Sequence, residues 1–392
     1  QSSKFMNGPP QVVCRTKHLI CATTAQCESL LHHYATTKSL SKTKQLHAHT
    51  ITSGLLSSHH STHPSLLATT YALCGHLSYA RKLFDELPQR TLFLCNIMIR
   101  MYTQNGLSYN AIQLFVEMLA SGHLRPDRYT FPFVIKACGD LSLLQLGVSV
   151  HCLTITSGVY SDTFVGNSLL AMYTSCGEKE RARRVFNTMQ ERSVVSWNTM
   201  ISGYFQNGCA KEALLIFSKM MNAGVEPDSA TIVSVLPACG YLKDLKCGRE
   251  VHDLVEQKGL GSKISVRNAL VDMYAKCGSM DEARLVFDKM DQRDVVTWTT
   301  MINGCILNGD MRSALGFCPM MQLEGIRPNS VTVASLLSAC ASLYYLKHGK
   351  CLHGWAIRQK LESDVIVETA LIDMYAKCNC VQLSFRVFTK TS

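Results

Sequence analysis

Residues 194–208 read VVSWNTMISGYFQNG, and the same pattern returns 101 positions later as VVTWTTMINGCILNG at residues 295–309. In the first copy the large apolar residues Trp197, Ile201 and Tyr204 are spaced i, i+4 and i+7. This spacing places them on one face of an α-helix. The Asn-Gly pair that follows can end a helix, because glycine readily adopts the left-handed conformation. The stretch therefore predicts an amphipathic helix that ends in a tight turn.

A second apolar stripe follows the turn and predicts a second helix. Its members again fall at helical spacing and are Ala213, Leu214, Phe217, Met220 and Met221. We expect this helix to stop at Gly224, because Pro227 just beyond it cannot continue a helix. The repeated unit is therefore predicted to be a hairpin of two helices.

The period of 101 residues extends over much of the chain. Four residue types recur at this offset in three successive copies: Cys138, Cys239 and Cys340; Tyr173, Tyr274 and Tyr375; His151, His252 and His353; and Pro126, Pro227 and Pro328. Each period holds three hairpins of 35, 35 and 31 residues. One hairpin cannot bury its own apolar stripes, so neighbouring hairpins must stack. The pattern predicts an all-α solenoid.

At this point the chain resembles the plant pentatricopeptide repeat proteins, specifically the PLS subclass, in which P, L and S variants of the hairpin alternate. The resemblance implies a right-handed α-solenoid superhelix of stacked two-helix repeats. The units it implies are L 24–60, S 61–91, P 92–127, L 128–162, S 163–193, P 194–228, L 229–263, S 264–294, P 295–329, L 330–364 and a truncated S 365–392. The first L unit and the P unit at 92–127 carry extra residues compared with the other units of their kind.

Both ends of the sequence look cut. The chain begins without Met, and its final unit has 28 residues instead of 31. We therefore expect a fragment that lacks the C-terminal E and DYW region found in part of the family. The N-terminal segment 1–23 is acidic-poor, which fits a remnant of an organellar transit segment or an eroded repeat equally well.

Composition excludes several classes of protein. A chain of 392 residues that is 47% hydrophobic and 17% charged is not disordered as its main state. The net charge of +10 favours a polyanionic partner. Two stretches, 45–80 and 141–161, lack Asp, Glu, Lys and Arg, but polar residues interrupt both, so no membrane association is expected. The 18 cysteines include no Cys-x-x-Cys pair, and we interpret them as reduced thiols.

The resemblance implies that each repeat reads one RNA base through the residues at its fifth and last positions, a mode of recognition known for such arrays. The RNA-binding residues it assigns are Asn96 with Asp127, Asn167 with Ser193, Asn198 with Asp228, Asn268 with Asp294, and Thr299 with Asn329. A carboxylate accepts the imino N–H of U or G, whereas an Asn amide donates to the bare ring nitrogen of C or A. Asp or Asn at the last position therefore distinguishes U and G from C and A.

In the family, Asn at the fifth position goes with pyrimidines, and Thr or Ser with purines. The three Asn–Asp pairs then look like U-binding pairs, Thr299 with Asn329 resembles an A-binding pair, and Asn167 with Ser193 suggests C. Ser65 with Thr91 fits no strong rule, and the L units have apolar fifth positions that are left without an assignment. Phe93, Val195 and Val296 match the apolar side chains that sandwich each base in the family.

The same residues also have purely structural explanations, and a second class of protein shares the helical hairpin. Asn and Asp are good N-cap residues, and an apolar second position can be ordinary packing. Tetratricopeptide repeats share the helical hairpin and bind peptides, but they run at 34 residues with a different aromatic pattern. A protein-binding scaffold of that kind is therefore the rival class.

Chemistry by this chain is not expected. The cytidine deaminase domain found in some family members needs His-x-Glu and Cys-x-x-Cys, and neither pattern occurs. Cys277, at the turn after its helix, is interpreted as a small buried hydrophobe and not as a metal ligand. The recurring His47, His151, His252 and His353 are interpreted as packed, hydrogen-bonded histidines. We expect no catalytic residue, no metal and no cofactor.

The sequence thus predicts a protein that binds single-stranded organellar RNA and takes no small-molecule substrate. The resemblance points to choosing sites for C-to-U editing in the mitochondrion or chloroplast, with an editing enzyme or cofactor proteins acting in trans. Transcript stabilisation or splicing is the alternative role within RNA binding.

Overall fold

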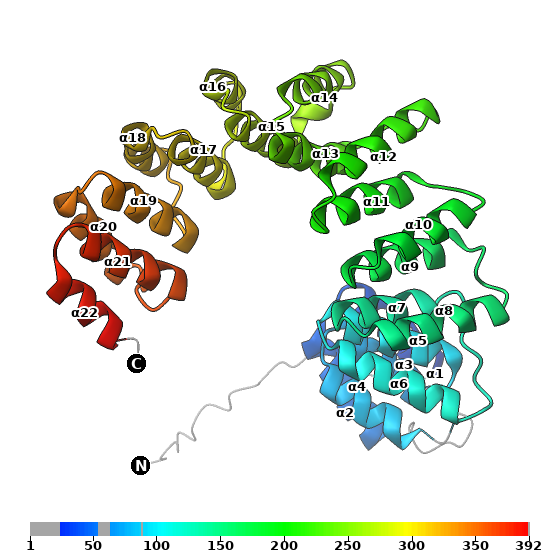
Figure 1. Ribbon diagram of the computed structural model, residues 1–392. Helices are drawn as coiled ribbons and strands as arrows, with labels where there is room; N and C mark the ends of the chain where they lie inside the picture. Colours follow the sequence, from blue (N-terminus) through cyan, green and yellow to red (C-terminus); the bar gives the residue numbers. More distant parts are fainter. Residues whose placement is uncertain (1–23, 54–62, 88, 391–392) are drawn as a thin grey trace, which may run out of the picture. The chain divides into compact units, whose positions relative to one another are not determined.

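The computed structural model describes residues 24–53, 63–87 and 89–390. All regular structure in these ranges is helical, with 22 α-helices, one 3-10 turn and no strand (Figure 1). The segment 1–23, interpreted above as a transit remnant or an eroded repeat, lies outside the described residues. No described helix is both long enough and apolar enough to cross a membrane.

The helices alternate between the first and second members of hairpins. The first helices are α1 Thr24–Thr36, α3 His63–Leu73, α5 Leu92–Gln104, α7 Phe131–Asp140, α9 Thr163–Ser175, α11 Val194–Gln206, α13 Ser229–Leu242, α15 Ile264–Lys276, α17 Val295–Leu307, α19 Ser330–Ser342 and α21 Val365–Lys377. The second helices are α2 Leu40–Thr52, α4 Leu77–Glu86, α6 Ser108–Ala120, α8 Leu144–Thr156, α10 Lys179–Thr188, α12 Ala210–Asn222, α14 Leu245–Gln257, α16 Met280–Asp288, α18 Met311–Leu323, α20 Leu346–Arg358 and α22 Val381–Lys390. The 3-10 turn η1 covers Leu260–Ser262.

The chain forms two compact units, one up to Leu141 and the other from Ser142 onward. In the first unit α1, α3, α5 and α7 contact one another in chain order, and in the second unit α9 to α21 do the same through their odd-numbered members. Each second helix also contacts the first helix of the next hairpin, as α12 contacts α13. Within each unit the hairpins therefore stack as an α-solenoid with its core between two layers, which confirms the predicted all-α class.

The predicted apolar residues of α11 are buried in the structure, whereas the predicted set on α12 needs one correction. Trp197, Ile201 and Tyr204 are buried against neighbouring helices, as their spacing predicts. On α12 the inclusion of Met221 was wrong, because this side chain is exposed and Ile216 takes part in the buried face instead. An α-helix turns about 100° per residue, which places Met221 at the edge of the face that Ala213, Ile216, Phe217 and Met220 form.

The turn inside each hairpin places one residue in the left-handed region. In the hairpins predicted as P and S units before residue 365 this residue is a glycine, such as Gly208 with φ +74°. In the hairpins predicted as L units the equivalent residue has a side chain, as in Lys243 with φ +54°. Because a Cβ is disfavoured at positive φ, these last turns carry local strain that the glycine turns avoid.

Successive first helices pack closely enough to exclude a side chain at some positions. A Cβ placed on Gly203 of α11 would lie 2.4 Å from the Thr174 side chain of α9. One turn later, the Asn207 amide donates to the Thr174 carbonyl at 2.9 Å and joins the two helices. These contacts set the spacing between neighbouring units.

The four recurring histidines are packed against tyrosines, as predicted. In each case His Nδ1 lies 2.8–3.0 Å from a Tyr hydroxyl of the next hairpin, and the pairs are His47 with Tyr71, His151 with Tyr173, His252 with Tyr274, and His353 with Tyr375. Burial lowers the pKa of each of these histidines below its usual value. The imidazoles are therefore neutral at pH 7, and each joins the second helix of one hairpin to the first helix of the next.

Stability is expected to fall as the pH drops below about 6.5, the ordinary histidine pKa. Because the four pKa values are lower in the folded chain, the unfolded chain binds more protons below this pH, so acid favours unfolding. Thermal melts at pH 7.5 and 5.5 measure this loss. Replacing all four histidines by Gln, which keeps a polar partner for each Tyr, should flatten the dependence. The exposed His33→Gln variant is the control and should keep the wild-type slope.

Candidate functional site

The structure brings four of the five predicted pairs together. The fifth-position side chain lies on a first helix, and the last-position side chain lies at the start of the next first helix. Each of the four Asn amides donates through Nδ2: Asn96 to Asp127 Oδ1 at 3.0 Å, Asn198 to Asp228 Oδ1 at 3.1 Å, Asn268 to Asp294 Oδ1 at 3.4 Å, and Asn167 to Ser193 Oγ at 3.4 Å. Each pair thus forms a small polar site shared by two neighbouring hairpins.

The fifth pair is arranged differently. The Thr299 hydroxyl donates to the Val295 carbonyl at 2.6 Å and lies 2.7 Å from the Thr332 hydroxyl. No hydrogen bond joins Thr299 to Asn329 among the described residues. Asn329 is instead engaged only through its Oδ1, which accepts from the Thr332 N–H at 2.9 Å and from its hydroxyl at 2.8 Å.

The interpretation of the last-position residues as helix caps is correct at four of the five sites. Ser193, Asp228, Asp294 and Asn329 are N-caps, and each forms a capping box with the residue three positions later. The remaining one, Asp127, accepts from the N–H groups of Tyr129 and Thr130 in the turn before α7. Capping therefore explains the local sequence, and it also limits which atoms remain for a ligand.

Capping leaves opposite chemical groups at the Asp and Asn sites. In Asp228 the cap uses Oδ1, which accepts from the Thr231 N–H at 2.8 Å, and no described residue donates to Oδ2. In Asn329 the cap also uses Oδ1, so the amide Nδ2 remains as a donor. An Asp site thus presents a hydrogen-bond acceptor and the Asn site presents a donor.

The carboxylates of Asp228 and Asp294 stay ionised at neutral pH. Burial alone would raise the pKa of Asp228, but hydrogen bonds from the Thr231 N–H and hydroxyl and from the Asn198 amide outweigh it and lower the pKa. The pKa of Asp294 is lowered in the same way, against the effect of burial, by Thr297 and Asn268. Both sites therefore offer a charged acceptor at pH 7.

Sequence reasoning missed a hydroxyl that belongs to every site. It comes from the third residue of the following unit, and the five residues are Thr130, Ser196, Thr231, Thr297 and Thr332. The signal was present, because each last-position residue begins a Ser/Asp/Asn-x-x-Ser/Thr pattern, the spacing of a capping box. The hydroxyl contacts the last-position side chain at each site.

The predicted apolar walls are exposed. Phe93 is 67% exposed, Val195 58% and Val296 52%. Tyr129, which sequence reasoning missed, is 57% exposed and faces the same pocket as Phe93. This pocket of about 450 Å³ also includes Asn96 and Asp127. It combines two aromatic surfaces with a hydrogen-bonding pair.

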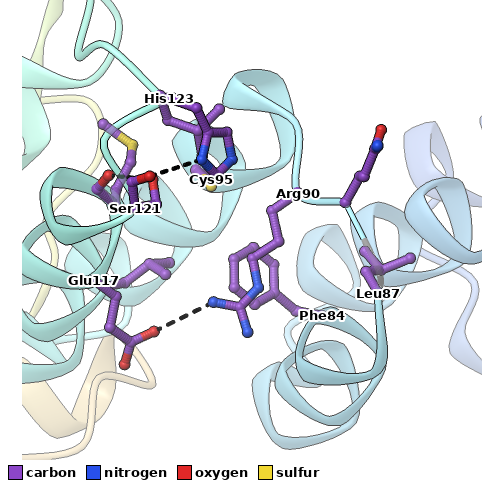
Figure 2. Close-up of a pocket in the computed structure, with 11 residues that line it drawn as sticks. Phe84, Leu87, Arg90, Cys95, Glu117, Ser121 and His123 are labelled. Carbon is purple, nitrogen blue, oxygen red and sulfur yellow. Dashed lines mark hydrogen bonds and ion pairs between the residues drawn. The ribbon is translucent and has the colours of Figure 1, made fainter.

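A second hollow of about 650 Å³ lies between α4, α5 and α6. Figure 2 shows the Arg90 guanidinium over the Phe84 ring, 4.7 Å from its centroid, with Glu117 beside it. Arg192 and Arg293 lie over phenylalanine rings at the same junction in later units. This recurrence assigns the arginine to the packing between S and P units and not to ligand binding.

The cysteines of the described residues are free thiols. Cys277 is half-buried, and burial raises its thiol pKa, as expected for a small hydrophobe. Among the described residues, no group of three or more His, Cys, Asp or Glu side chains is placed to hold a metal ion.

Comparison with known protein families decides the identity of the repeats. Residues 93–123, 167–194 and 265–295 match the PPR repeat, and residues 192–240 and 293–342 match the PPR repeat family. The chain is a pentatricopeptide repeat protein. The matched segments overlap every predicted P and S unit from 92 to 329.

Several plant pentatricopeptide repeat proteins are similar over most of this chain. The pentatricopeptide repeat-containing protein At5g39350 of Arabidopsis thaliana is 54% identical over 97% of the chain, which spans 56% of that protein. Two others from Arabidopsis thaliana are named chloroplastic (At1g11290, 38% identical over 83% of the chain) and mitochondrial (At2g03380, 39% over 82%). The chain spans 40% and 47% of these two proteins, so it covers only part of each relative.

A crystal structure of the pentatricopeptide repeat protein PPR10 in complex with an 18-nt psaJ RNA element has a similar fold. The TM-score is 0.66 over 87% of this chain and 51% of that chain, with 16% sequence identity. At this identity the likeness concerns the fold alone.

Proposed function

We propose that this pentatricopeptide repeat protein binds single-stranded RNA by sequence, with one base for each repeat, and that the L units are the ones without an assigned base. The observation that carries the proposal is the recurring Asn–Asp pair, in which the printed hydrogen bonds engage Oδ1 of the carboxylate, as in Asp228. In unit 92–127 the pair shares a pocket with the exposed Phe93 and Tyr129. The net charge of +10 and the RNA bound in the PPR10 structure support a polyanionic ligand. Recognition, and not catalysis, is the role proposed for this chain.

The bases follow from the groups left free by capping. Units 92–127, 194–228 and 264–294 present a carboxylate oxygen and an Asn N–H, which suit the imino N–H and a carbonyl of U. Unit 295–329 presents the Asn329 amide donor, which suits the bare ring nitrogen of A. Unit 163–193 is proposed for C. With the N-terminal end toward the RNA 5′ end, the order is U, any, C, U, any, U, A.

We further propose a role of the PLS type, the choice of sites for C-to-U editing in an organelle. The chloroplastic and mitochondrial names of relatives support an organellar location. The reaction would be carried out by an enzyme acting in trans. Stabilisation or splicing of an organellar transcript would use the same RNA-binding surface.

Exchanging the fifth-position and last-position residues of one unit tests the proposal. The double variant Asn198→Thr with Asp228→Asn should change the preferred base at one position from U to A, because it replaces the free carboxylate oxygen by an amide donor. The expected change in relative affinity is on the order of tenfold, about 1 kcal/mol or somewhat more. The measurement is competition binding at one fixed salt concentration with RNAs that carry UACUAUA between oligo-A flanks and differ only at the second U of this core.

The same exchange at Asn268 and Asp294 is the matched control. It should change the preference at the third U of the core and leave the second U as in the wild type. If the wild type and the first variant rank the four bases identically, the assigned register is wrong. A chain that retains no preferred sequence from pooled RNA would contradict sequence-specific binding altogether and favour a protein-binding scaffold.

A further inference from the structure

Two units with the same Asn–Asp pair differ in the hydrogen bonds that hold their Asn amide. Asn96 with Asp127 and Asn198 with Asp228 both make the Nδ2 to Oδ1 hydrogen bond, at 3.0 and 3.1 Å. At Asn96 the amide oxygen also accepts from the Thr130 hydroxyl at 2.6 Å. At Asn198 the amide oxygen is buried without a hydrogen-bond partner among the described residues. The difference therefore lies in one hydroxyl contact.

The two hydroxyls are otherwise equivalent. Thr130 Oγ1 lies 2.9 Å from Asp127 Oδ1 and accepts from the Asp127 N–H at 3.1 Å. Thr231 Oγ1 lies 2.9 Å from Asp228 Oδ1 and accepts from the Asp228 N–H at 3.1 Å. Both side chains are fully buried. A hydroxyl carries one hydrogen, so Thr130 shares it between Asp127 Oδ1 and Asn96 Oδ1, whereas Thr231 donates to Asp228 Oδ1 alone. Removing the hydroxyl costs a contact to the last-position Asp in both units, and a contact to Asn only at Thr130.

We propose that Thr130 is a specificity-determining positioning residue, which holds the Asn96 amide so that only its N–H faces the ligand. This inference rests on the proposed function and adds a third residue to the site. With Asn96 Oδ1 accepting from Thr130 and one Nδ2 hydrogen on Asp127, the second Nδ2 hydrogen is the group left for a base. Ser196 holds Asn167 in the same way, with its hydroxyl 2.6 Å from Asn167 Oδ1.

The consequence concerns discrimination between pyrimidines. An Asn that presents N–H favours a base carbonyl, as in U, whereas an amide free to rotate can also present its oxygen to the amino group of C. The hydroxyl belongs to the unit after the one that reads the base. Base recognition by one repeat is therefore completed by its C-terminal neighbour.

The test is the ratio of affinities for U and C at the base assigned to unit 92–127, measured by competition with the UACUAUA probe and its first-position variants. Thr130→Val, which keeps the shape and removes the hydroxyl, should reduce this ratio by roughly five- to tenfold, the value of one net hydrogen bond. Thr130→Ser, which keeps a hydroxyl, should restore it. Thr231→Val is the matched comparison: it also loses the contact to the last-position Asp but loses none to Asn, so the ratio at its own base should fall by clearly less than in Thr130→Val.

Each outcome decides between the two proposals. Equal losses in Thr130→Val and Thr231→Val, or no loss in either, would overturn the positioning role while leaving RNA binding intact. A wild-type chain with no preference for U at this base would overturn the assigned register and the positioning role together. Should Thr130→Val melt at a clearly lower temperature than Thr130→Ser, the Ser196→Ala variant provides an independent test. It frees the Asn167 amide to present its oxygen to the amino group of C and should therefore raise the ratio of affinities for C and U at the base assigned to unit 163–193. An unchanged ratio there would count against the inference.

Discussion

Replacing Trp298 by alanine is expected to lower the free energy of unfolding by about 3–5 kcal/mol, the usual cost of deleting a large buried aromatic side chain. Trp298 is only 1% exposed. Its ring lies 5.0 Å from Phe287 and 6.0 Å from Phe317 between centroids, so it joins α16, α17 and α18. The loss should appear in urea unfolding followed by circular dichroism, with the transition split into steps because a solenoid is stabilised locally.

Trp197 is the matched comparison, 101 residues earlier in the repeat. Its ring lies 4.9 Å from Phe186, but Ile216 stands where Phe317 stands in the later unit. Trp197→Ala should therefore cost about 1 kcal/mol less, the approximate value of one aromatic pair. The surface variant Leu323→Ala, at a side chain that is 87% exposed, should change stability by less than about 0.5 kcal/mol. Equal losses in all three variants would contradict the assigned packing.

Removing either aromatic wall of the 92–127 pocket is expected to weaken RNA binding by about 1–3 kcal/mol, which corresponds to roughly 5- to 150-fold in affinity. Phe93 and Tyr129 line one pocket from neighbouring units, whereas the 194–228 site has Val195 and Ala230 at the equivalent positions. A flat ring offers a base a larger stacking surface than an aliphatic side chain. Phe93→Ala or Tyr129→Ala should therefore cost more than Val195→Ala.

An abasic probe separates stacking from a general loss of affinity. With an RNA that lacks the base assigned to unit 92–127, wild type and Phe93→Ala should bind with nearly equal affinity. Tyr109→Ala removes an exposed aromatic side chain from the second helix of the same unit and should leave binding unchanged. An equal effect of Phe93→Ala on the intact and abasic probes would show that Phe93 does not contact this base.

Of the two wall residues, Phe93 was identified from the sequence and Tyr129 was not. Phe93 was assigned because it occupies the second position of a P unit, where the family places an apolar wall. Tyr129 occupies the same position in an L unit, whose apolar fifth residue left the unit without an assigned base. A pocket made between two units draws one wall from each, so assigning residues unit by unit identifies only half of it.

The sequence by itself determined the period, the hairpins, the residues that face the polar sites and the structural role of the histidines. These features depend on spacing along the chain, because helix faces, turns and caps are set by residues within one or two helical turns. Only the tertiary structure decided which oxygen of Asp228 remains free, that Tyr129 faces Phe93, and that Asn96 is held by Thr130 while Asn198 is not. These last features depend on how closely one hairpin packs on the next. The Thr130 hydroxyl contacts Asn96 because the two oxygens lie 2.6 Å apart. A hydrogen bond weakens over tenths of an ångström, and two identical Asn–Asp pairs in a sequence do not reveal differences of that size.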